Sequence, residues 1–240
     1  MTLFHIDKEK CKRDGICARV CPGKIILQPA KKDYPVPSID AEEFCIDCGH
    51  CVAACPHGAL TLKTMPISDC PVINRETLPD AAAARQLLLA RRSVRCYQKK
   101  CIPQNVIQEL IDTARYAPTG SNRQPVHWTV IQKPDDVQHL ASLVIDFFKL
   151  MLPLATDDLS VRRFRRIIHT WDAGIDRIMR NAPHLVIASS PTDMSFPATD
   201  CATALAYLEL YAFSRGLGTC WAGYFTGAAN AHPPIMDLLS

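Results

Sequence analysis

Four cysteines within eleven residues constrain this chain more than any other feature of its sequence. The run is Cys45-x2-Cys48-x2-Cys51-x3-Cys55, and Pro56 follows directly. Three thiolates at this tight spacing can bind one corner of an iron–sulfur cube, whereas the cysteine before proline points away and ligates a second cluster. A structural zinc site would need two separated pairs of Cys or His instead. The run therefore predicts iron–sulfur clusters rather than zinc.

An imperfect copy of the run lies 34 residues upstream, so the segment contains an internal repeat. The copy consists of Cys11, Asp14, Cys17, Cys21 and Pro22, with an aspartate in place of the second cysteine. A carboxylate can bind iron, although it is a harder and weaker ligand than a thiolate. Three alternatives stay open: an Asp-ligated [4Fe-4S] cluster, a [3Fe-4S] cluster without that corner, or a turn aspartate that never touches metal.

The distribution of cysteines also divides the chain into domains. Seven of the 12 cysteines lie in residues 1–65, a segment with few apolar residues to bury, which therefore needs a metal or covalent staple. Residues 66–80 contain three prolines and are expected to form a linker before a second domain, residues 81–240. Because no export signal precedes the clustered cysteines, they indicate cofactors in a reducing, cytoplasmic location.

Composition excludes two classes of partner. No run of about 18 apolar residues is present, so we expect no transmembrane helix and no membrane association. The net charge of +3 is too small to indicate nucleic-acid binding on electrostatic grounds.

Helical and strand patterns alternate in the second domain, which indicates an α/β or α+β fold. The helix 199–215 is apolar over much of its surface, so we expect it to be buried. The expected helices cover 81–91, 104–116, 140–152, 159–181 and 199–215, and the expected strands cover 126–131, 185–188 and 219–223.

Three stretches of the second domain carry ligand-binding chemistry. The first, Arg91-Arg92-Ser93-Val94-Arg95, offers fork-like donors that suit a phosphate, although such a run can also be solvated surface. The second, 117–128, is a turn in which the amides of Asn122 and Gln124 can both donate and accept at the edge of a planar ligand. The third, Gly216-Leu217-Gly218-Thr219-Cys220-Trp221-Ala222-Gly223, follows the apolar helix.

Two family resemblances rest on these motifs. Residues 1–65 resemble a bacterial-type ferredoxin domain, and the three later stretches resemble the FMN-dependent nitroreductase family. An N-terminal two-cluster ferredoxin joined to such a domain is a known arrangement. The resemblances imply an α+β protein, with a small ferredoxin-like iron–sulfur domain followed by an α/β nitroreductase-like FMN domain.

The ferredoxin resemblance implies that the two copies exchange ligands. One [4Fe-4S] cluster would be held by Cys45, Cys48, Cys51 and Cys21. The other cluster, [4Fe-4S] or [3Fe-4S], would be held by Cys11, Cys17 and Cys55, with Asp14 in the fourth place. We expect His50 and His57 to be surface or packing residues rather than ligands.

The nitroreductase resemblance implies the FMN contacts. The FMN phosphate and ribityl end would be held by Arg91, Arg92, Ser93 and Arg95. The isoalloxazine ring would be met from the other subunit of a homodimer by Pro118, Thr119, Gly120 and Asn122, with Gln124 in the same turn. The backbone of Cys220, Trp221 and Gly223 would line the ring near N5, although Trp221 can equally be a core aromatic.

The family pattern also bears on the C-terminus. Members usually continue beyond the equivalent of Ser240 with a last strand and a basic residue that contacts the phosphate. We therefore expect that the domain is truncated at its C-terminus or lacks this arm.

The implied function is an oxidoreductase whose clusters pass electrons to FMN, which then reduces a small, aromatic or electron-poor substrate. The electron donor would be an external ferredoxin or NAD(P)H, and a lid within 144–159 would select the substrate. No catalytic side chain is identifiable, because His127 also has a structural explanation. Two alternatives are a ferredoxin-type electron relay without turnover, and a family variant that acts as a reductive dehalogenase or processes flavin.

A basic helical face is left without a defined role. It would consist of Arg162, Arg165, Arg166 and His169, which share one side of the expected helix. The face is either solvated surface or a docking patch for an acidic electron carrier.

Overall fold

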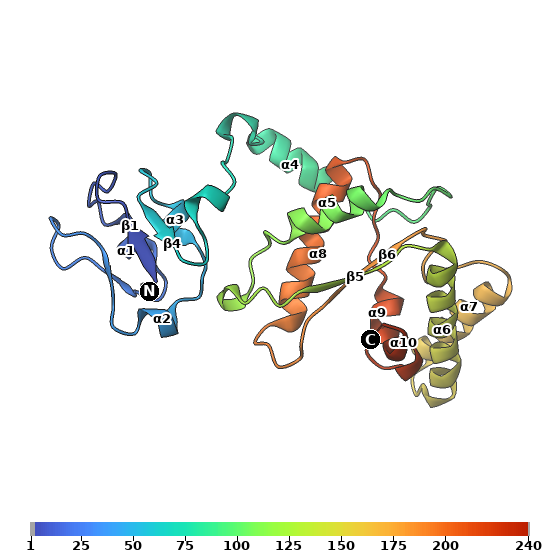
Figure 1. Cartoon of the computed structure of the whole chain (residues 1–240). Helices are drawn as coiled ribbons and strands as arrows, with labels where there is room; N and C mark the ends of the chain where they lie inside the picture. Colours follow the sequence, from blue (N-terminus) through green and yellow to red (C-terminus); the bar gives the residue numbers. More distant parts are fainter. Residues whose placement is uncertain (1–2, 240) are drawn as a thin grey trace. The chain divides into compact units, whose positions relative to one another are not determined.

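The computed structural model describes residues 3–239, which form two compact units (Figure 1). The first unit contains residues 3–78 together with Thr119–Arg123, and the second contains Pro79–Pro118 and the chain from Gln124 onward. Both units combine helices with strands, which confirms the predicted α+β class.

Short strands and helices build the first unit. Strand β1 (Phe4–Ile6) pairs antiparallel with β4 (Leu60–Leu62), and β2 (Ile26–Leu27) pairs antiparallel with β3 (Val36–Pro37). The helices are α1 (Ile16–Val20), α2 (Ala41–Phe44) and α3 (His50–Ala53), and two 3₁₀ turns follow at Ile67–Asp69 and Arg75–Thr77. The expected linker 66–80 thus contains short helical turns.

The sequence repeat recurs as a structural repeat. Helices α1 and α3 each begin directly after a glycine with a left-handed backbone, Gly15 (φ 70°) and Gly49 (φ 68°). These glycines are 34 residues apart, the same period as the cysteine repeat. A Cβ atom at either position would meet the far end of a flexible side chain, that of Gln28 or of Met65, which can move aside, so it is the left-handed backbone that favours glycine.

Cysteines form part of the hydrophobic core of the first unit. Cys17, Cys21 and Cys51 are buried together with apolar residues of β1 and β4 such as Phe4 and Leu60. Three of the seven repeat cysteines are therefore in the core of the unit, whereas Cys11, Cys45, Cys48 and Cys55 are partly exposed.

The second unit is dominated by helices around one strand pair. Strands β5 (His127–Ile131) and β6 (Leu185–Ser189) pair antiparallel, from His127 opposite Ser189 to Ile131 opposite Leu185. Helix α5 packs against α8, and α6 packs against α7, α9 and α10. The helices are α4 (Ala81–Ala90), α5 (Gln104–Ala114), α6 (Pro134–Met151), α7 (Asp158–Asp172), α8 (Pro197–Ser214), α9 (Gly223–Ala229) and α10 (Pro233–Leu239).

Two expected elements of the second unit are wrong. The helix predicted over 159–181 ends at Asp172, because Gly174 adopts a left-handed backbone (φ 77°) and Asp176 then accepts hydrogen bonds from the backbone N–H groups of Ile178 and Met179. The strand predicted over 219–223 is an irregular segment instead. It makes a single backbone bond to the 91–95 stretch, from Val94 N to Thr219 O at 2.8 Å, and α9 starts at Gly223.

Helix α6 supplies the centre of the larger core. Val137, Leu140, Val144 and Ile145 are fully buried in a cluster that also includes residues of α7, α9 and α10. By length and composition alone α6 could cross a membrane, but a buried core helix has the same properties, and its apolar face is the core here.

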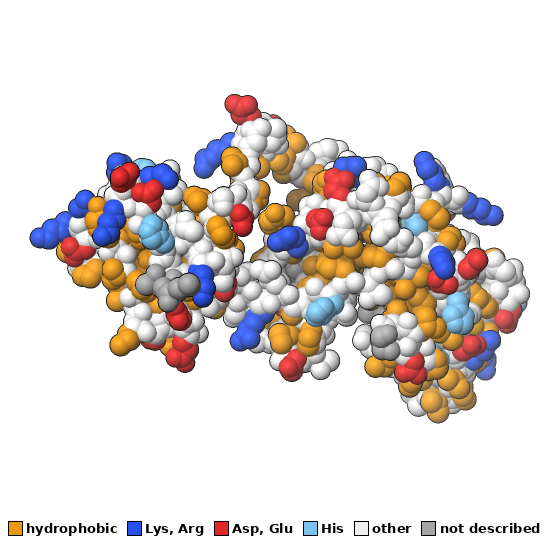
Figure 2. All heavy atoms as spheres, viewed as in Figure 1, with side chains coloured by type: hydrophobic (Ala, Val, Ile, Leu, Met, Phe, Trp, Pro, Cys, Tyr) orange, Lys and Arg blue, Asp and Glu red, His pale blue; other side chains and the backbone are white. Residues whose placement is uncertain are grey.

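Helix α8 is less buried than its sequence predicts. Leu208 and Ala212 pack with Leu110 and Ala114 of α5, whereas Tyr207 on the same helix is 42 % exposed. Figure 2 shows apolar side chains at the surface of the second unit. Trp221 and Met236 are among the large apolar residues that are exposed.

Candidate functional site

One pocket of the first unit gathers four of the predicted ligands. Its lining includes Cys45, Cys48 and Cys51 from the second copy of the repeat, and Cys21 from the first copy. Apolar side chains such as Ile26 surround these thiols. The pocket thus combines soft sulfur ligands with a hydrophobic wall, the environment that an iron–sulfur cluster requires.

A second pocket of the same unit gathers the other four predicted ligands. Its lining includes Cys11, Asp14 and Cys17 from the first copy and Cys55 from the second. Each copy therefore sends its last cysteine, Cys21 or Cys55, to the other copy's pocket. The pockets group the eight side chains in the same two sets that the ferredoxin resemblance implies, although the ligand assignments themselves stay a prediction.

The electrostatics of the thiols fit a cationic cofactor. Burial raises the pKa of the Cys51 thiol to about 11, and burial also raises the pKa values of Cys17 and Cys45. Neighbouring cysteines add to each increase, because several thiolates at close range repel one another. A metal centre held by these residues would supply the positive charge that favours their thiolate forms.

The donor set of the two pockets fits iron–sulfur clusters. Together the pockets gather seven cysteine thiols and one carboxylate, and thiolates are the ligands that hold such clusters. Among residues 3–239, no three His, Cys, Asp or Glu side chains form a compact group that could hold a single metal ion.

Asp14 has protein partners in addition to its place in the pocket. Its Oδ1 atom accepts a hydrogen bond from the backbone N–H of Ile16 at 3.0 Å, which closes the turn before α1. Its Oδ2 atom lies 3.6 Å from Nε2 of His57, which also lines the pocket. The turn role of Asp14 is therefore real, and one carboxylate oxygen still faces the pocket side with His57. His57, which we expected to be a surface or packing residue, is a neighbour of the candidate ligand.

In the second unit, the structure brings two of the three ligand-binding stretches together. The 91–95 and 216–223 stretches share the Val94–Thr219 backbone bond, and a Cβ atom at Gly218 would lie only 2.7 Å from the Val94 side chain. This close approach requires glycine at position 218. The predicted phosphate-binding and ring-lining stretches consequently lie next to each other.

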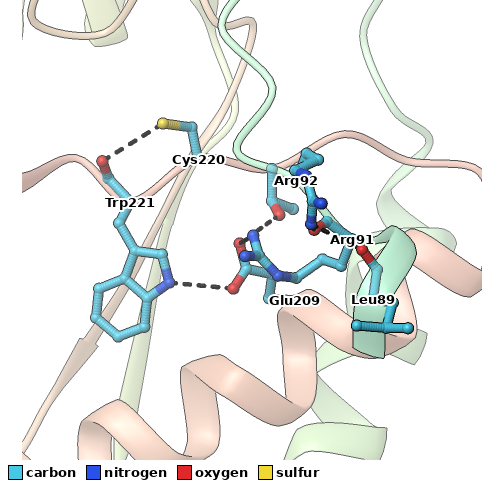
Figure 3. A network of polar contacts seen from close by, with 7 residues as sticks. Leu89, Arg91, Arg92, Glu209, Cys220 and Trp221 are labelled. Atoms are coloured by element: carbon cyan, nitrogen blue, oxygen red, sulfur yellow. Dashed lines mark hydrogen bonds and ion pairs between the residues drawn. The ribbon is translucent and has the colours of Figure 1, made fainter. Parts of the chain in front are cut away.

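The arginines of the first stretch already have protein partners (Figure 3). Arg91 Nη1 donates to Oε1 of Glu209 at 3.1 Å. Arg92 Nη1 donates to the carbonyl oxygens of Leu89 at 2.7 Å and of Arg91 at 2.9 Å, so it caps the C-terminal end of α4. Each guanidinium group has five N–H donors, so these contacts leave donors for a phosphate. Phosphate binding by Arg91, Arg92, Ser93 and Arg95 stays a prediction.

Trp221 is not a core aromatic. Its side chain is 52 % exposed, and its indole Nε1 donates to Oε2 of Glu209 at 3.2 Å (Figure 3). An exposed ring whose polar edge is anchored in the protein leaves its apolar faces available. This environment favours the ligand-lining role over the packing role for Trp221.

The turn predicted to meet the flavin ring lies mainly in the first unit. Ser121, Asn122 and Gln124 have left-handed backbones, with φ values of 50°, 54° and 48°. The side-chain amide of Asn122 donates to the carbonyl oxygens of Ile46 at 3.1 Å and Asp47 at 2.9 Å, two residues between Cys45 and Cys48. Thr119 and Gly120 belong to the same unit, whereas Pro118 and Gln124 belong to the second. Asn122 therefore contacts the loop that is predicted to bind a cluster, a contact that no sequence pattern indicated.

Two residues of the second-unit site escaped the sequence reasoning. Glu209 is buried, with 9 % of its surface exposed, and accepts from Arg91, Thr219 and Trp221. A single acid within the apolar second half of α8 was the available signal. The other residue is Tyr97, whose pKa is raised to about 12, first by burial and then by the nearby Cys220, and the sequence carried no signal for it. The candidate proton donor His127 is exposed on β5.

Comparisons with known proteins agree with this geometry. A model of the nitroreductase family matches residues 88–240, and a model of a 4Fe-4S dicluster domain matches residues 9–60. Among solved structures, a nitroreductase with bound FMN from Bacteroides fragilis is 26% identical with a TM-score of 0.55, covering 65% of this chain and 76% of that chain. A BluB-like flavoprotein from Clostridium difficile is 21% identical with a TM-score of 0.52, covering 65% and 80%.

Curated relatives match over shorter stretches. Iodotyrosine deiodinase 1 of Sus scrofa is 28% identical over 116 residues, which is 46% of this chain and 40% of the relative. A putative NADH dehydrogenase/NAD(P)H nitroreductase of Methanothermobacter thermautotrophicus is 22% identical over 144 residues, 58% of this chain and 60% of the relative. The chain thus spans less than two thirds of the length of these relatives. Because the family model covers more than half of the chain and coincides with the site, the chain belongs to the nitroreductase family, with a 4Fe-4S dicluster domain at its N-terminal end.

Proposed function

We propose that this protein is an iron–sulfur flavoprotein oxidoreductase that passes electrons from two clusters to FMN and reduces a small, aromatic or electron-poor molecule. Membership in the nitroreductase family supports an FMN-dependent oxidoreductase, and the dicluster match supports the electron-carrying domain. The observation that carries the proposal is the grouping of eight ligand-type side chains into two pockets of a chain that also has a nitroreductase domain.

Different residues of the second unit would bind different parts of FMN. Arg95 and Ser93 would bind the phosphate together with the remaining donors of Arg91, because paired N–H groups match phosphate oxygens. The exposed Trp221 ring and the backbone of 220–223 would line the flavin ring. FMN, when bound, can accept one or two electrons, so it connects one-electron carriers to a two-electron reduction.

The first unit would supply the electrons. Cys21, Cys45, Cys48 and Cys51 would hold one cluster, and Cys11, Cys17, Cys55 and Asp14 the other. The amide of Asn122 would brace the Cys45–Cys48 loop through its two carbonyl contacts. An external ferredoxin or NAD(P)H would be the donor, and a cytoplasmic homodimer would be the working form.

Reductive dehalogenation is a second candidate reaction. The deiodinase relatives favour it, because iodotyrosine deiodinase 1 aligns with nearly half of this chain. Carbon–halogen and nitro groups both accept electrons from a reduced flavin, so the same site could serve either reaction. A relay protein without its own turnover remains the alternative against which both are tested.

Cofactor analysis of protein purified without oxygen tests the proposal. We expect iron, acid-labile sulfide and FMN, with cluster content lost in Cys48→Ser but kept in the control Cys201→Ser. Zinc in place of iron, or failure to bind added FMN, would overturn the corresponding half.

Electron donors and substrates can then be separated by parallel assays. NADH, NADPH and reduced ferredoxin are each tested for bleaching of the flavin, and the reduced protein is then mixed with a nitroaromatic or with iodotyrosine. Reoxidation by one compound identifies the reaction class. Reoxidation by neither, with rapid electron exchange to a protein acceptor, would support the relay alternative.

A further inference from the structure

Glu209 is the centre of the polar network in Figure 3. Its carboxylate accepts from the guanidinium of Arg91 at 3.1 Å, the hydroxyl of Thr219 at 3.1 Å and the indole N–H of Trp221 at 3.2 Å. Arg91 comes from the predicted phosphate-binding stretch, whereas Thr219 and Trp221 come from the predicted ring-lining stretch. One side chain therefore connects two segments that are more than 100 residues apart in the sequence.

The chemistry of Glu209 is unusual for its position. Helix α8 is apolar along most of its length, and a buried carboxylate there is tolerated only when it is paired and hydrogen-bonded. The three donors satisfy both oxygen atoms, so replacing the carboxylate with an uncharged amide would leave Arg91 without its counter-ion and would offer the indole N–H a weaker, neutral acceptor. Such a loss costs more than the contacts themselves contribute.

Trp221 has a specific need for this acceptor. The ring is largely exposed, so packing alone does not hold its orientation. Its indole N–H bond to Glu209 anchors the polar edge and so fixes the direction in which the ring faces are presented. Other hydrogen bonds also hold the irregular 217–222 segment: Val94 N donates to the Thr219 carbonyl, the Thr219 hydroxyl donates to Glu209, and Leu217 N donates to the Ala212 carbonyl of α8.

We propose that Glu209 is the positioning residue of the flavin site: its carboxylate holds the Trp221 indole and the 219–221 segment against Arg91, so that ring-lining and phosphate-binding groups are preorganised for one flavin. Glu209 would act through Trp221, Thr219 and Arg91 rather than by touching the cofactor. This inference rests on the proposed FMN function, and its first test below does not require flavin.

The first test follows the indole signals by NMR. The protein has three tryptophans, and Trp221→Phe identifies the N–H signal of Trp221. In Glu209→Gln, which keeps the shape but lacks the charge, this signal should shift and its hydrogen exchange should accelerate. The matched control is Glu109→Gln, because Glu109 on α5 is also a carboxylate, and it pairs with Tyr211 of α8 and with Arg215 directly after that helix. The Trp221 signal should be unchanged in the control.

The second test measures FMN affinity in a double-mutant cycle. Glu209→Gln should weaken FMN binding about tenfold or more, the effect of losing a charge-assisted hydrogen bond, and Glu109→Gln should not. The effects of Glu209→Gln and Trp221→Phe should be strongly non-additive, because both remove the same contact. If Glu209→Gln does not fold, Thr219→Val removes one donor to the carboxylate and should show a smaller loss of affinity and a shift of the Trp221 signal.

The outcomes separate this inference from the proposed function. An unchanged Trp221 signal, or equal losses of FMN affinity in Glu209→Gln and Glu109→Gln, would overturn the positioning role. If the wild type itself binds no FMN, the proposed function fails, while the NMR comparison still decides whether Glu209 positions Trp221.

Discussion

At the scale of single residues, Asp14 is the most informative departure from the cysteine repeat. It takes the place that Cys48 has in the second copy, and it lines a pocket with Cys11, Cys17 and Cys55. The carboxylate also closes the turn before α1 through Ile16. The type of cluster in this pocket decides whether Asp14 also binds iron: a [4Fe-4S] cluster has an iron at this corner, whereas a [3Fe-4S] cluster lacks it.

We predict that the iron next to Asp14 is the most labile in the protein. A carboxylate binds this iron more weakly than a thiolate, so mild oxidation should convert the cluster in that pocket to a three-iron form. A near-isotropic EPR signal in the oxidised protein measures the conversion. Asp14→Cys should suppress it, whereas the exposed control Asp172→Cys should not. If wild type and Asp14→Cys lose iron equally, Asp14 is a turn residue and does not bind iron.

Tyr97 provides a prediction about pH. Burial raises its pKa from 10.0 to about 12, so the folded protein favours the protonated phenol. This preference stabilises the fold below pH 10 and is lost as the pH rises from about 10 to about 12. Denaturant titrations across that range should show stability falling less steeply in Tyr97→Phe than in wild type. The exposed Tyr116→Phe should follow the wild type, and a wild-type slope in Tyr97→Phe would contradict the assignment.

At the scale of elements, the contact between the 91–95 and 216–223 stretches organises the site of the second unit. The sequence predicted both stretches as ligand-binding and predicted a strand over 219–223. The segment is not a strand, because one backbone hydrogen bond to Val94 does not make a β-ladder. The side chains of Thr219 and Trp221 are instead held by hydrogen bonds to Glu209. Strand propensity cannot predict the conformation of a segment that is held by one buried carboxylate rather than by a sheet.

Gly218 tests this contact directly. In Gly218→Ala the new Cβ atom would lie 2.7–2.9 Å from the Val94 side chain, so the two stretches must separate. We expect a loss of about 1–3 kcal/mol in unfolding free energy, typical of overpacking, together with weaker FMN binding. Thermal unfolding and flavin titration measure the two effects.

A matched glycine serves as the control. Gly227 is exposed in α9, and a Cβ atom there would meet nothing within 4 Å. Gly227→Ala should therefore be neutral or stabilise the protein by about 0.5–1 kcal/mol, as expected for alanine in a helix. Equal stability of the two variants would mean that the stretches tolerate separation.

At the scale of the whole molecule, the partly exposed α8 predicts self-association. The helix is apolar along most of its length, yet Tyr207 is 42 % exposed within one protomer. A homodimer that covers this face would explain why the helix is apolar and yet partly exposed in one protomer. An obligate interface should bury about 2,000 Å² or more. Analytical ultracentrifugation should therefore detect a dimer.

A charge on the exposed side of α8 should break that dimer. Tyr207→Glu would bury an unpaired carboxylate in the interface and shift the population toward monomer. Leu150→Glu, at an exposed position of α6, is the control and should leave the dimer intact. A monomeric wild type that holds FMN tightly would refute the interface.

The sequence by itself determined the features that depend on local spacing. The predicted ligands within each cysteine run are only a few residues apart, so the pattern is visible in the sequence itself. The same 34-residue period separates Gly15 and Gly49, which precede α1 and α3. The helix boundaries of α4, α5 and α8 also followed from apolar periodicity and from proline. These properties arise within a few residues, so composition and spacing suffice to predict them.

Only the tertiary structure decided the contacts between distant segments. It paired Arg91 with Glu209 across 118 residues, and it placed Thr119–Arg123 in the first unit, where Asn122 contacts the Cys45–Cys48 loop. A buried carboxylate needs donors wherever the fold can supply them, and nothing in the local sequence identifies those donors. The physical reason is that burial and hydrogen-bond satisfaction are properties of the packed chain as a whole.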